Sequence, residues 1–412
     1  MCRDCGSVVT VAKAILHGEE ATWLAHCASD CTSLVRTPGP PVQRGSTVLL
    51  ADARAIYDHG QVTYGRGGLA TQAALCAALA DLEGAEQTFL YPSGLAAITG
   101  VLMAICSMGD ELLVSDSVYG PTRRFIAGTL ARYGVTARYF SPDAAPAEVA
   151  ALIGPATRAI FLESPGSLTM EMQDVPGIAA MARARGVLTV IDNTWAAGVL
   201  FKPLAQGVDI SLQSLTKYVC GHSDVFMGMA AARGAVAELL ARASHEIGWA
   251  VSPDDAYMAL RGLRTLHTRL ARHGASALAV AQWLAAQPEV AAVHCPGLPE
   301  APGHAVWARD FSGLCGLFSF ELQPEHAGGV ERMLDRLSLF GLGYSWGGFE
   351  SLAIPCDPQL GSRTYPARFA GPLVRLHVGL EDVADLTHDL RRGLDALGAC
   401  GAAVLDESIV TA

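Results

Sequence analysis

Between about residues 61 and 250 the sequence repeats one pattern, in which short apolar runs end in polar residues or glycine and Ala- and Leu-rich helical stretches follow. Four apolar runs are predicted strands, at 111–114, 158–162, 187–191 and 208–212, and a helix is expected at 178–185. Strands that are apolar throughout and separated by helices are typical of a parallel sheet covered on both faces. The pattern therefore predicts an α/β protein built on a mostly parallel sheet.

Three units are expected along the chain. Residues 1–60 would form an N-terminal arm, with an amphipathic helix at 11–27 and a helix-breaking Pro- and Gly-rich run at 37–41. Residues 61–255 would form the large sheet domain. Residues 256–412 would form a smaller C-terminal α/β domain. The elements expected towards this end of the chain are a long helical pattern at 254–287, strands at 317–322 and 373–378, and a last helix at 382–397.

Composition excludes several classes of protein. Hydrophobic residues make up 51% of the 412 residues and charged residues 17%, which is too apolar and too weakly charged for a disordered chain. The formal charge of −11 argues against a nucleic-acid partner, because binding a phosphate backbone needs clustered basic residues. The N-terminus lacks the pattern of a signal peptide, so a cytoplasmic protein is expected.

One stretch raises the question of a membrane span. Residues 87–109 carry no charge and are long enough to cross a bilayer. The stretch contains Pro92, Ser93, Gly94 and Gly100, and Ser93-Gly94 is typical of a turn from a strand into a helix. We interpret it as a buried helix and expect no membrane partner.

The 11 cysteines are scattered over a long chain, which favours reduced thiols over a disulfide framework. Near the N-terminus, Cys2, Cys5, Cys27 and Cys31 lie in two pairs with His26 beside them. Four thiols in two pairs could hold a structural zinc ion, although the second pair is more widely spaced than usual. The alternative is a poorly ordered arm without metal, and we expect no metal site.

Polar residues at the ends of the predicted strands suggest chemistry, since ligands of open parallel sheets sit beyond the carboxyl ends of the strands. Asp192 follows one strand and Lys217 lies just beyond the next. Ser93-Gly94 opens a helix whose free N–H groups favour a phosphate. This set fits pyridoxal phosphate, with Lys217 forming the Schiff base and Asp192 pairing with the protonated pyridine nitrogen. Taken singly, such a lysine is more often solvated and such an aspartate more often caps a helix.

A series of short motifs runs in a fixed order along the chain. They are Tyr64-Gly65-Arg66, Tyr91-Pro92-Ser93-Gly94, Asp116-Ser117-Val118-Tyr119-Gly120, Leu162-Glu163-Ser164-Pro165-Gly166-Ser167, Asp192-Asn193-Thr194-Trp195-Ala196, Ser214-Leu215-Thr216-Lys217-Tyr218, Gly221-His222-Ser223-Asp224, Tyr344-Ser345-Trp346-Gly347-Gly348 and Arg375-Leu376-His377-Val378-Gly379-Leu380-Glu381. Over about residues 41–397 the sequence resembles the Cys/Met-metabolism family of pyridoxal-phosphate enzymes, of the aspartate aminotransferase-like fold type I. Within that family it is most similar to the cystathionine β-lyases.

The resemblance implies a role for each matching residue. The cofactor phosphate would be held by the backbone N–H groups of Gly94 and Leu95 and by the hydroxyls of Ser214 and Thr216. Tyr119 would stack on the pyridine ring. Arg375 would clamp the α-carboxylate of the substrate through a bidentate fork, with Ser345 and Trp346 framing it. Tyr64 and Arg66 would reach the cofactor of a neighbouring subunit, which implies a catalytic dimer that usually pairs into a homotetramer.

The implied reaction is α,β-elimination on cystathionine, as in transsulfuration, or on another L-cysteine thioether. Lys217 would remove the Cα proton, a thiolate would leave from Cβ with Lys217 or the neighbour's Tyr64 as the acid, and the products would be a thiol, pyruvate and ammonia. One alternative is a γ-lyase or γ-synthase acting on homoserine or methionine derivatives. Another is a scaffold without activity, which the intact Asp192, Lys217 and Arg375 disfavour.

The sequence departs from the family pattern at one position. Cystathionine β-lyases commonly carry a second arginine directly after the one that binds the phosphate, and here that position is Gly67. The missing arginine would lie towards the far end of the substrate, beyond the sulfur. Losing such a charge partner costs on the order of 1–3 kcal/mol of binding. A cysteine thioether other than cystathionine is therefore also a candidate substrate.

Other polar residues have plainer interpretations. His222 and Asp224 could suggest a metal pair, but a structural turn is favoured there. Cys220 is expected to be a packed thiol rather than a nucleophile, and His377 a satisfied core histidine. Arg123 and Arg124 are expected to begin a helix and to face solvent or an interface.

Overall fold

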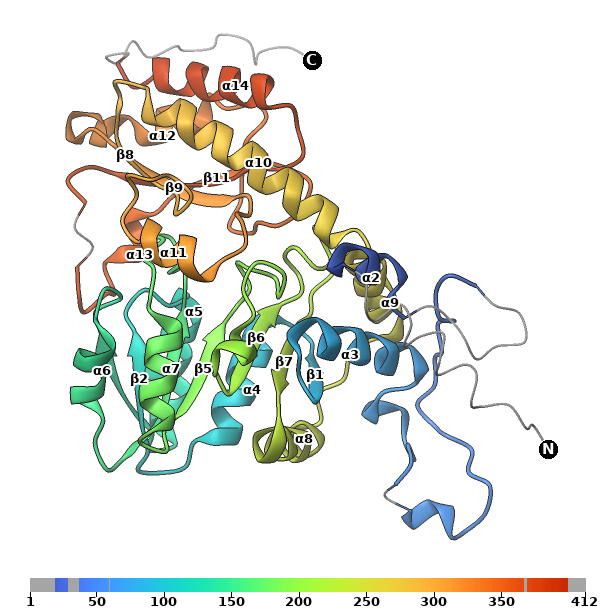
Figure 1. The fold of residues 1–412 in the computed structure, drawn as a ribbon. Coiled ribbons are helices and arrows are strands. Elements are labelled where there is room, and N and C mark those ends of the chain that lie inside the picture. Colours follow the sequence, from blue (N-terminus) through green and yellow to red (C-terminus); the bar gives the residue numbers. More distant parts are fainter. Residues whose placement is uncertain (1–18, 29–36, 59, 367–368, 399–412) are drawn as a thin grey trace, which may run out of the picture.

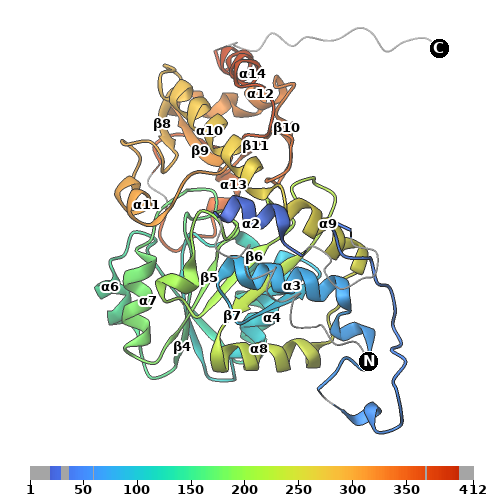
Figure 2. The same cartoon turned by 45° about the vertical axis from the view of Figure 1, so that its right-hand side comes forward.

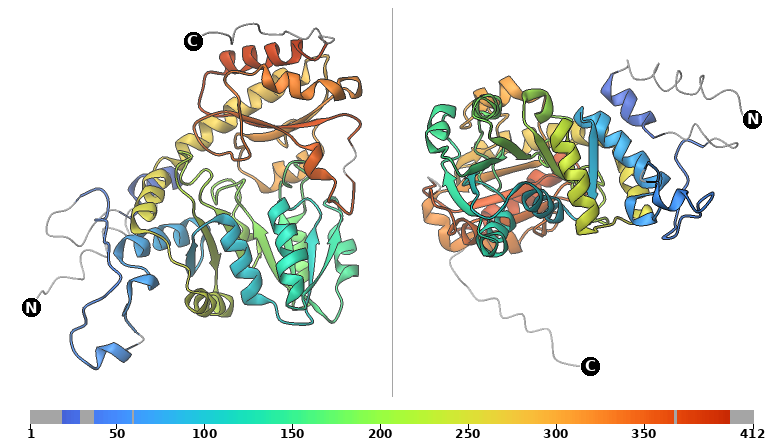
Figure 3. Two further views of the ribbon diagram at one scale, coloured as in Figure 1. Left: turned by 180° about the vertical axis from the view of Figure 1, so that it is seen from behind. Right: turned by 90° about the horizontal axis from the view of Figure 1, so that it is seen from below.

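The computed structural model describes residues 19–28, 37–58, 60–366 and 369–398. Its two sheets lie one above the other, with the larger sheet formed by residues 87–232 and the smaller by residues 290–377 (Figure 1). The segment between residues 40 and 69, drawn in blue, extends away from both sheets (Figures 1 and 3). The domain limits at residues 60 and 255 remain a prediction.

The larger sheet has seven strands in the order β1-β7-β6-β5-β4-β2-β3. They are β1 (Gln87–Tyr91), β2 (Glu111–Ser115), β3 (Thr136–Phe140), β4 (Thr157–Glu163), β5 (Leu188–Asp192), β6 (Ile210–Ser214) and β7 (Gly228–Ala232). Strands β3, β2, β4, β5 and β6 are mutually parallel, whereas β7 is antiparallel to both of its neighbours, β6 and β1. The expectation of a mostly parallel α/β sheet is confirmed, and the antiparallel β7 was not foreseen.

Helices cover both faces of this sheet, which explains why the central strands are largely buried, whereas the edge strands β1 and β3 are partly exposed. Alternate residues of one strand face opposite cores: Ile160 packs on one side of β4, and Phe161 packs on the other. One face carries α4 (Gly94–Ile105), α5 (Gly120–Phe125) and α8 (Gly234–Ile247). The other carries α2 (Glu20–His26), α3 (Ala70–Glu83), α6 (Pro146–Leu152), α7 (Val175–Arg183) and α9 (Pro253–Leu263).

The smaller sheet has five strands in the order β10-β11-β12-β9-β8. They are β8 (Val290–His294), β9 (Leu317–Leu322), β10 (Gly341–Leu342), β11 (Leu352–Pro355) and β12 (Leu373–His377). Its helices are α10 (Leu266–Ala285), α11 (His304–Asp310), α12 (Val330–Asp335), α13 (Asp357–Leu360) and α14 (Val383–Asp395). Helix α10 runs from the region of α9 up to this sheet and so links the two halves of the molecule (Figure 2).

Two sequence interpretations need correction. Residues 87–109 do not form one buried helix: Gln87–Tyr91 is strand β1, and helix α4 begins only at Gly94. The helical pattern at 254–287 is two helices, because the backbone leaves the helical ladder at Arg264 and Thr265 between α9 and α10. The start of the helix at Ser93-Gly94 was foreseen, but the strand before it and the break at Arg264 and Thr265 were not.

Candidate active site

A cavity of about 220 Å³ lies at the carboxyl ends of β4, β5 and β6, where ligands of such sheets bind. It brings together most of the residues that the motifs singled out, although they are far apart in the sequence. Those that line it are Gly94, Leu95, Tyr119, Asp192, Ser214, Thr216, Lys217, Trp346 and Arg375. Ser345 reaches the same place through its hydrogen bond to Lys217.

Lys217 sits in the turn after β6, and its Nζ donates to the Ser345 hydroxyl at 2.8 Å. The ammonium also lies 5.3 Å from the centre of the Trp346 ring. The loop that carries these two residues comes so near that a Cβ on Gly347 would lie 2.8 Å from the Lys217 carbonyl carbon. Burial, reinforced by the charge of Arg375, lowers the pKa of Lys217 to about 8. A neutral amine is therefore accessible near physiological pH.

The segment that carries Lys217 is anchored at both ends by residues that pair across neighbouring strands. Gly228 of β7 pairs with Ser214 of β6 on one side and with Tyr91 of β1 on the other. The segment 215–227, which carries Lys217, therefore leaves the sheet after Ser214 and returns to it at Gly228, directly opposite Ser214. Both points lie beside the start of α4. A Cβ on Gly228 would lie 2.3 Å from the Ser93 carbonyl oxygen, so only glycine allows this approach.

Asp192 ends β5 and lies half-buried in the cavity floor, where its Oδ1 accepts from the Thr194 N–H at 3.0 Å and from the Thr194 hydroxyl. No ion pair to it is found within the described residues. Burial raises the pKa of the Asp192 carboxyl, which the Thr194 hydrogen bonds oppose. A carboxyl of this kind is suited to a cationic ligand group that would lower its pKa again.

Glu163 belongs to the same floor, and the sequence analysis assigned it no role. It ends β4 directly beside Asp192 in the strand register, and its Oε2 accepts from the Tyr119 backbone N–H at 2.7 Å. Burial and the neighbouring Asp192 raise the pKa of Glu163 well above its ordinary value. The signal in the sequence was the one that identified Asp192, a carboxylate directly after an apolar strand.

The N-terminus of α4 forms one wall. The Ser93 hydroxyl caps the helix by accepting from the Ala96 N–H at 3.1 Å, and this leaves the N–H groups of Gly94 and Leu95 directed out of the helix. A Cβ on Gly94 would lie 2.5 Å from the Ser214 Cβ, so the glycine brings the helix start against Ser214. The Thr216 hydroxyl, in contrast, already donates to the Met227 carbonyl at 3.2 Å.

Arg375 and Tyr119 close the cavity from the other side. Arg375 lies on β12 of the smaller sheet, is 7% exposed, and donates to the Tyr344 carbonyl at 2.9 Å. Among the described residues it has no carboxylate partner, and burial lowers its pKa. Tyr119 remains 43% exposed, with its pKa raised by partial burial. The arginine is thus free to bind an anion.

Tyr64 and Arg66 do not reach this cavity within one chain. Tyr64 is 52% exposed, and the Arg66 guanidinium donates to the His245 carbonyl at 2.9 Å. Both lie on the segment that extends away from the sheets (Figure 3). Their part in a neighbouring site remains a prediction.

The remaining interpretations have mixed outcomes. Arg123 is buried rather than solvent-facing, because it pairs with Asp116 and lies 3.8 Å from the Tyr139 ring centre. Cys220 is a buried thiol whose pKa burial raises to about 12, as expected for packing. His377 is buried, but its Nδ1 has no hydrogen-bond partner.

Cys2, Cys5 and Cys31 of the proposed cysteine cluster lie outside the described residues. The parts of the chain that the structure does describe contain no group of metal-binding side chains. In those same parts, no helix has both the length and the apolar character needed to cross a membrane.

The cavity fits pyridoxal phosphate. Its fit rests on two unpaired backbone N–H groups beside a free Ser214 hydroxyl, a half-buried carboxyl without a counter-ion and a lysine of lowered pKa. These are the donors for a phosphate, the partner for a pyridinium nitrogen and the amine for an aldehyde, in that order.

Comparisons with known proteins agree with this arrangement. Residues 21–395 match the model of a family described as Cys/Met metabolism PLP-dependent enzymes. A putative cystathionine β-lyase of Rhizobium johnstonii is 46% identical over 92% of this chain and 96% of its own. The cystathionine β-lyase of Escherichia coli is 43% identical over 81% of this chain and 86% of its own. The crystal structure of cystathionine γ-lyase from Lactobacillus plantarum, complexed with L-serine, superposes with a TM-score of 0.85, at 32% identity over 93% of this chain and 100% of that one.

Proposed function

Because the chain belongs to the Cys/Met metabolism PLP-dependent enzymes, we propose that it is a carbon–sulfur lyase that breaks the Cβ–S bond of cystathionine or of another L-cysteine thioether. Its cofactor is pyridoxal phosphate. The observation that carries the proposal is the convergence of Lys217, Asp192 and Arg375 on one cavity, each without an ion-pair partner among the described residues.

Pyridoxal phosphate supplies an electron sink for the pair that remains when a proton leaves Cα. In our assignment Gly94, Leu95 and Ser214 hold its phosphate, and Asp192 holds its ring nitrogen. Thr216 contributes less than expected, because its hydroxyl is engaged by Met227. Tyr119 covers the ring face, and Glu163 holds Tyr119 in place through its backbone N–H.

The chain's own residues then place and move one proton. Arg375 binds the α-carboxylate, which sets the Cα–H bond of the substrate relative to Lys217. The Lys217 amine, held by Ser345 at 2.8 Å, takes the Cα proton. Because burial and Arg375 lower the pKa of Lys217 to about 8, a useful share of this amine is neutral near pH 7 to 8. The protonated Lys217 can then supply the proton that the departing thiolate needs.

The distal half of the substrate is where this chain differs from the pattern of cystathionine β-lyases. Gly67 stands where a second arginine is common, and a Cβ added there would meet nothing within 4 Å. Gly67→Arg should therefore fold normally and should lower KM for L-cystathionine about five- to hundredfold if that distal charge matters. An unchanged KM would indicate that the natural substrate lacks a distal carboxylate.

We further propose that two copies share their sites, with Tyr64 and Arg66 of each copy serving the other, and that dimers pair into tetramers. Support comes from the exposure of Tyr64 and from the extended segment that carries both residues. Mixing inactive Tyr64→Ala and Lys217→Ala chains after unfolding and refolding should restore activity in part, because some hybrid sites are then intact. No recovery, with hybrids shown by mass, would contradict the shared site. We also expect a cytoplasmic location, in keeping with the free thiols of the described cysteines.

Product analysis tests the proposed activity. Holoenzyme incubated with L-cystathionine should release pyruvate and homocysteine, whereas S-alkyl cysteines should release pyruvate and the matching thiol. Release of 2-oxobutyrate and cysteine would instead favour the γ-lyase alternative, and formation of cystathionine from an activated homoserine would favour the γ-synthase. Purified chain that shows no absorbance near 420 nm with added pyridoxal phosphate would refute all three activities.

A further inference from the structure

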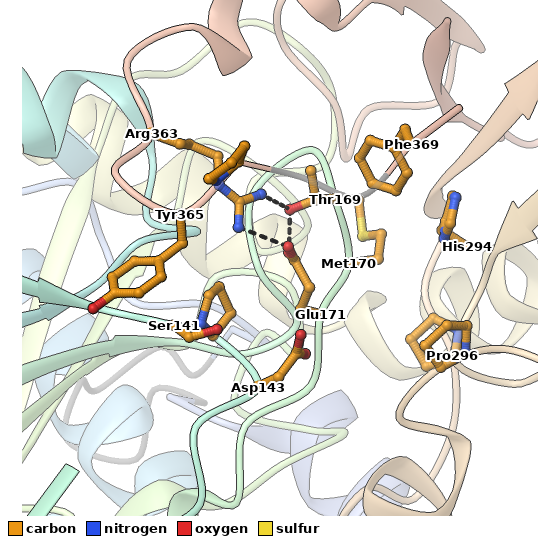
Figure 4. Close-up of a pocket in the computed structure, with 13 residues that line it drawn as sticks. Ser141, Asp143, Thr169, Met170, Glu171, His294, Pro296, Arg363, Tyr365 and Phe369 are labelled. Atoms are coloured by element: carbon orange, nitrogen blue, oxygen red, sulfur yellow. Dashed lines mark hydrogen bonds and ion pairs between the residues drawn. The ribbon is translucent and has the colours of Figure 1, made fainter. Parts of the chain in front are cut away.

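A second cavity, larger than the one around Lys217, lies between the two sheets and has a volume of about 480 Å³ (Figure 4). That volume lies within the range of small-molecule sites, about 300–1,000 Å³. Its walls come from four separate parts of the chain: residues 141–143 after β3, the loop 169–171 after β4, residues 294–302 at and after the end of β8, and residues 363–366 with Phe369 before β12. None of the residues to which the proposed reaction assigns a role lines it.

One wall of this cavity is held rigidly by a buried guanidinium. Arg363, whose side chain is 7% exposed, donates to the Thr169 hydroxyl at 3.1 Å and to Glu171 Oε1 at 2.8 Å (Figure 4). Its Nε lies 3.7 Å from a carboxylate oxygen of Asp116, which is itself fully buried. Because these partners already engage Arg363, the guanidinium forms part of the wall and is not available to bind an anion.

The described charges around the cavity are predominantly negative. Asp143 is exposed at the rim, and no described residue forms an ion pair with it. Glu171 pairs with Arg363, and Asp116 behind it pairs with both Arg363 and Arg123, so these charges balance and Asp143 is the carboxylate in excess. His294 does not offset this, since burial lowers its pKa and its Nε2 is 3.6 Å from Glu321. The balance favours a cationic occupant over an anionic one.

The opposite wall is apolar and aromatic. The rings of His294 and Phe369 lie 4.8 Å apart, and Figure 4 shows them with Pro296 on the side away from Asp143. Tyr365 and further prolines complete the lining. Aromatic faces attract a desolvated cation, and prolines offer a rigid apolar surface to its hydrocarbon part. The lining thus matches a compact organic cation with an apolar body.

From this combination we propose that the cavity is a second ligand site, which takes a small organic ammonium compound with an apolar body. The site is separate from the Lys217 cavity: among the described residues, the two linings have only Met170 in common. The cationic group faces Asp143, the lining carboxylate without an ion pair among the described residues, and the apolar body packs against Phe369 and His294. The proposal does not depend on the lyase activity.

Calorimetric titration of the holoenzyme with benzyltrimethylammonium tests the site, because this quaternary cation cannot react with a pyridoxal aldehyde. Saturable binding with one site per chain is expected. Benzenesulfonate, of similar size and opposite charge, should bind at least about tenfold more weakly. Equal binding of the two ions, or no saturation by the cation below 10 mM as an order-of-magnitude limit, would overturn the proposal.

Variants locate the cation. Asp143→Lys should weaken binding of benzyltrimethylammonium about tenfold or more, and Phe369→Leu about threefold to tenfold. The matched control is Asp335→Lys, the same charge change at an exposed position at the end of α12. If Asp335→Lys weakened binding as much as Asp143→Lys, the effect would be one of net charge and not of a site. If Trp346→Ala abolished binding while Phe369→Leu did not, the cation would lie in the Lys217 cavity, and the proposal would be wrong.

Discussion

The two cavities lie side by side but differ in whether their charged side chains form ion pairs. Around Lys217 the charged groups form no ion pairs with described residues: the half-buried Lys217 bonds a hydroxyl, the half-buried Asp192 a threonine, and the buried Arg375 a backbone carbonyl. Around Arg363 the charges are paired, since Arg363 contacts both Glu171 and Asp116, and Asp116 also pairs with Arg123. Burying an unpaired charge destabilises a fold, whereas pairing it offsets part of that cost.

We infer that the unpaired charged groups serve to bind ligands, whereas the paired groups serve to stabilise the fold. The unpaired groups of the Lys217 cavity can be satisfied only when cofactor and substrate arrive. The paired groups of the Arg363 cavity tie the segment before β12 to the ends of β2 and β4. Substitutions in the first set should therefore reduce catalysis, and substitutions in the second set should reduce stability.

The largest expected effect tests the first half of this comparison. Lys217→Ala should lower kcat by about 10³-fold or more and should abolish the absorbance near 420 nm, because the amine that moves the proton is gone. Steady-state pyruvate release and a spectrum of the reconstituted protein measure this. Lys202→Ala is the control, since that ammonium bonds the Leu82 carbonyl and Glu20 outside the cavity. Retained turnover in Lys217→Ala would refute the mechanism.

The second prediction concerns the paired set. Arg363→Met should lower the free energy of unfolding by about 3–5 kcal/mol, because Glu171 loses its only ion-pair partner among the described residues and Asp116 loses one of two. Urea denaturation of the purified protein measures it. Adding Glu171→Gln to this variant should recover part of the loss, since one uncompensated carboxylate disappears. A stability loss below about 1 kcal/mol would show that the pair does not hold the two segments together.

A milder effect is expected when Arg375 is replaced by lysine, which keeps the positive charge but not the planar guanidinium group. Arg375→Lys should raise KM about ten- to hundredfold, because an ammonium cannot bind a carboxylate through two parallel hydrogen bonds. Its free energy of unfolding should change by less than about 1 kcal/mol, since no described carboxylate depends on it. Arg138→Lys, at the half-exposed pair with Glu111, is the matched control and should leave KM unchanged. A fall in stability without a change in KM would place Arg375 in the paired class.

The smallest expected effect is a pH dependence of the free energy of unfolding of the cofactor-free chain, caused by the unpaired Lys217. The pKa of Lys217 is lowered to about 8, so between about pH 8 and 10.5 the unfolded state binds more protons than the folded state. Stability from this group should therefore rise with pH across that window, and the penalty should be fully present below pH 8. Relative to Lys217→Met, the wild-type chain should gain on the order of 1–2 kcal/mol between pH 8 and 10. Parallel curves for the two proteins would contradict the lowered pKa.

Four of the five mutually parallel strands could be predicted, because each contains a run of apolar residues; β3, with the sequence TARYF, was missed. The strands predicted at 111–114 and 158–162 are β2 and β4, each within one residue at either end. Strand β7 was missed, since Gly228–Ala232 consists of Gly, Met and three Ala and has no β-branched or aromatic residue. Its identity as a strand comes from its two neighbours in the sheet and not from its own side chains.

Residues expected to contact the cofactor or the substrate could be predicted from the sequence. Residues that only form ion pairs with other side chains could not. Lys217, Asp192 and Arg375 carry charges at strand ends or in motifs, and the structure brings them to one cavity. Arg363 stands in no recognisable pattern, and its partner Asp116 is distant in sequence. Arg123 looked like a surface residue because sequence spacing does not show that the Asp116 carboxylate lies beneath it.

The pairing of Tyr91, Gly228 and Ser214 across three adjacent strands suggests where this protein can be engineered. The segment 215–227, which carries Lys217, begins after Ser214 and ends before Gly228, so both of its ends are anchored by strand pairing. Residues late in this segment, such as the 75%-exposed Phe226, are therefore positions where libraries of side chains can be installed with little effect on the lysine's coordinates. Phe226 also lines the cavity, which makes it a practical starting point for retuning the leaving groups that the site accepts.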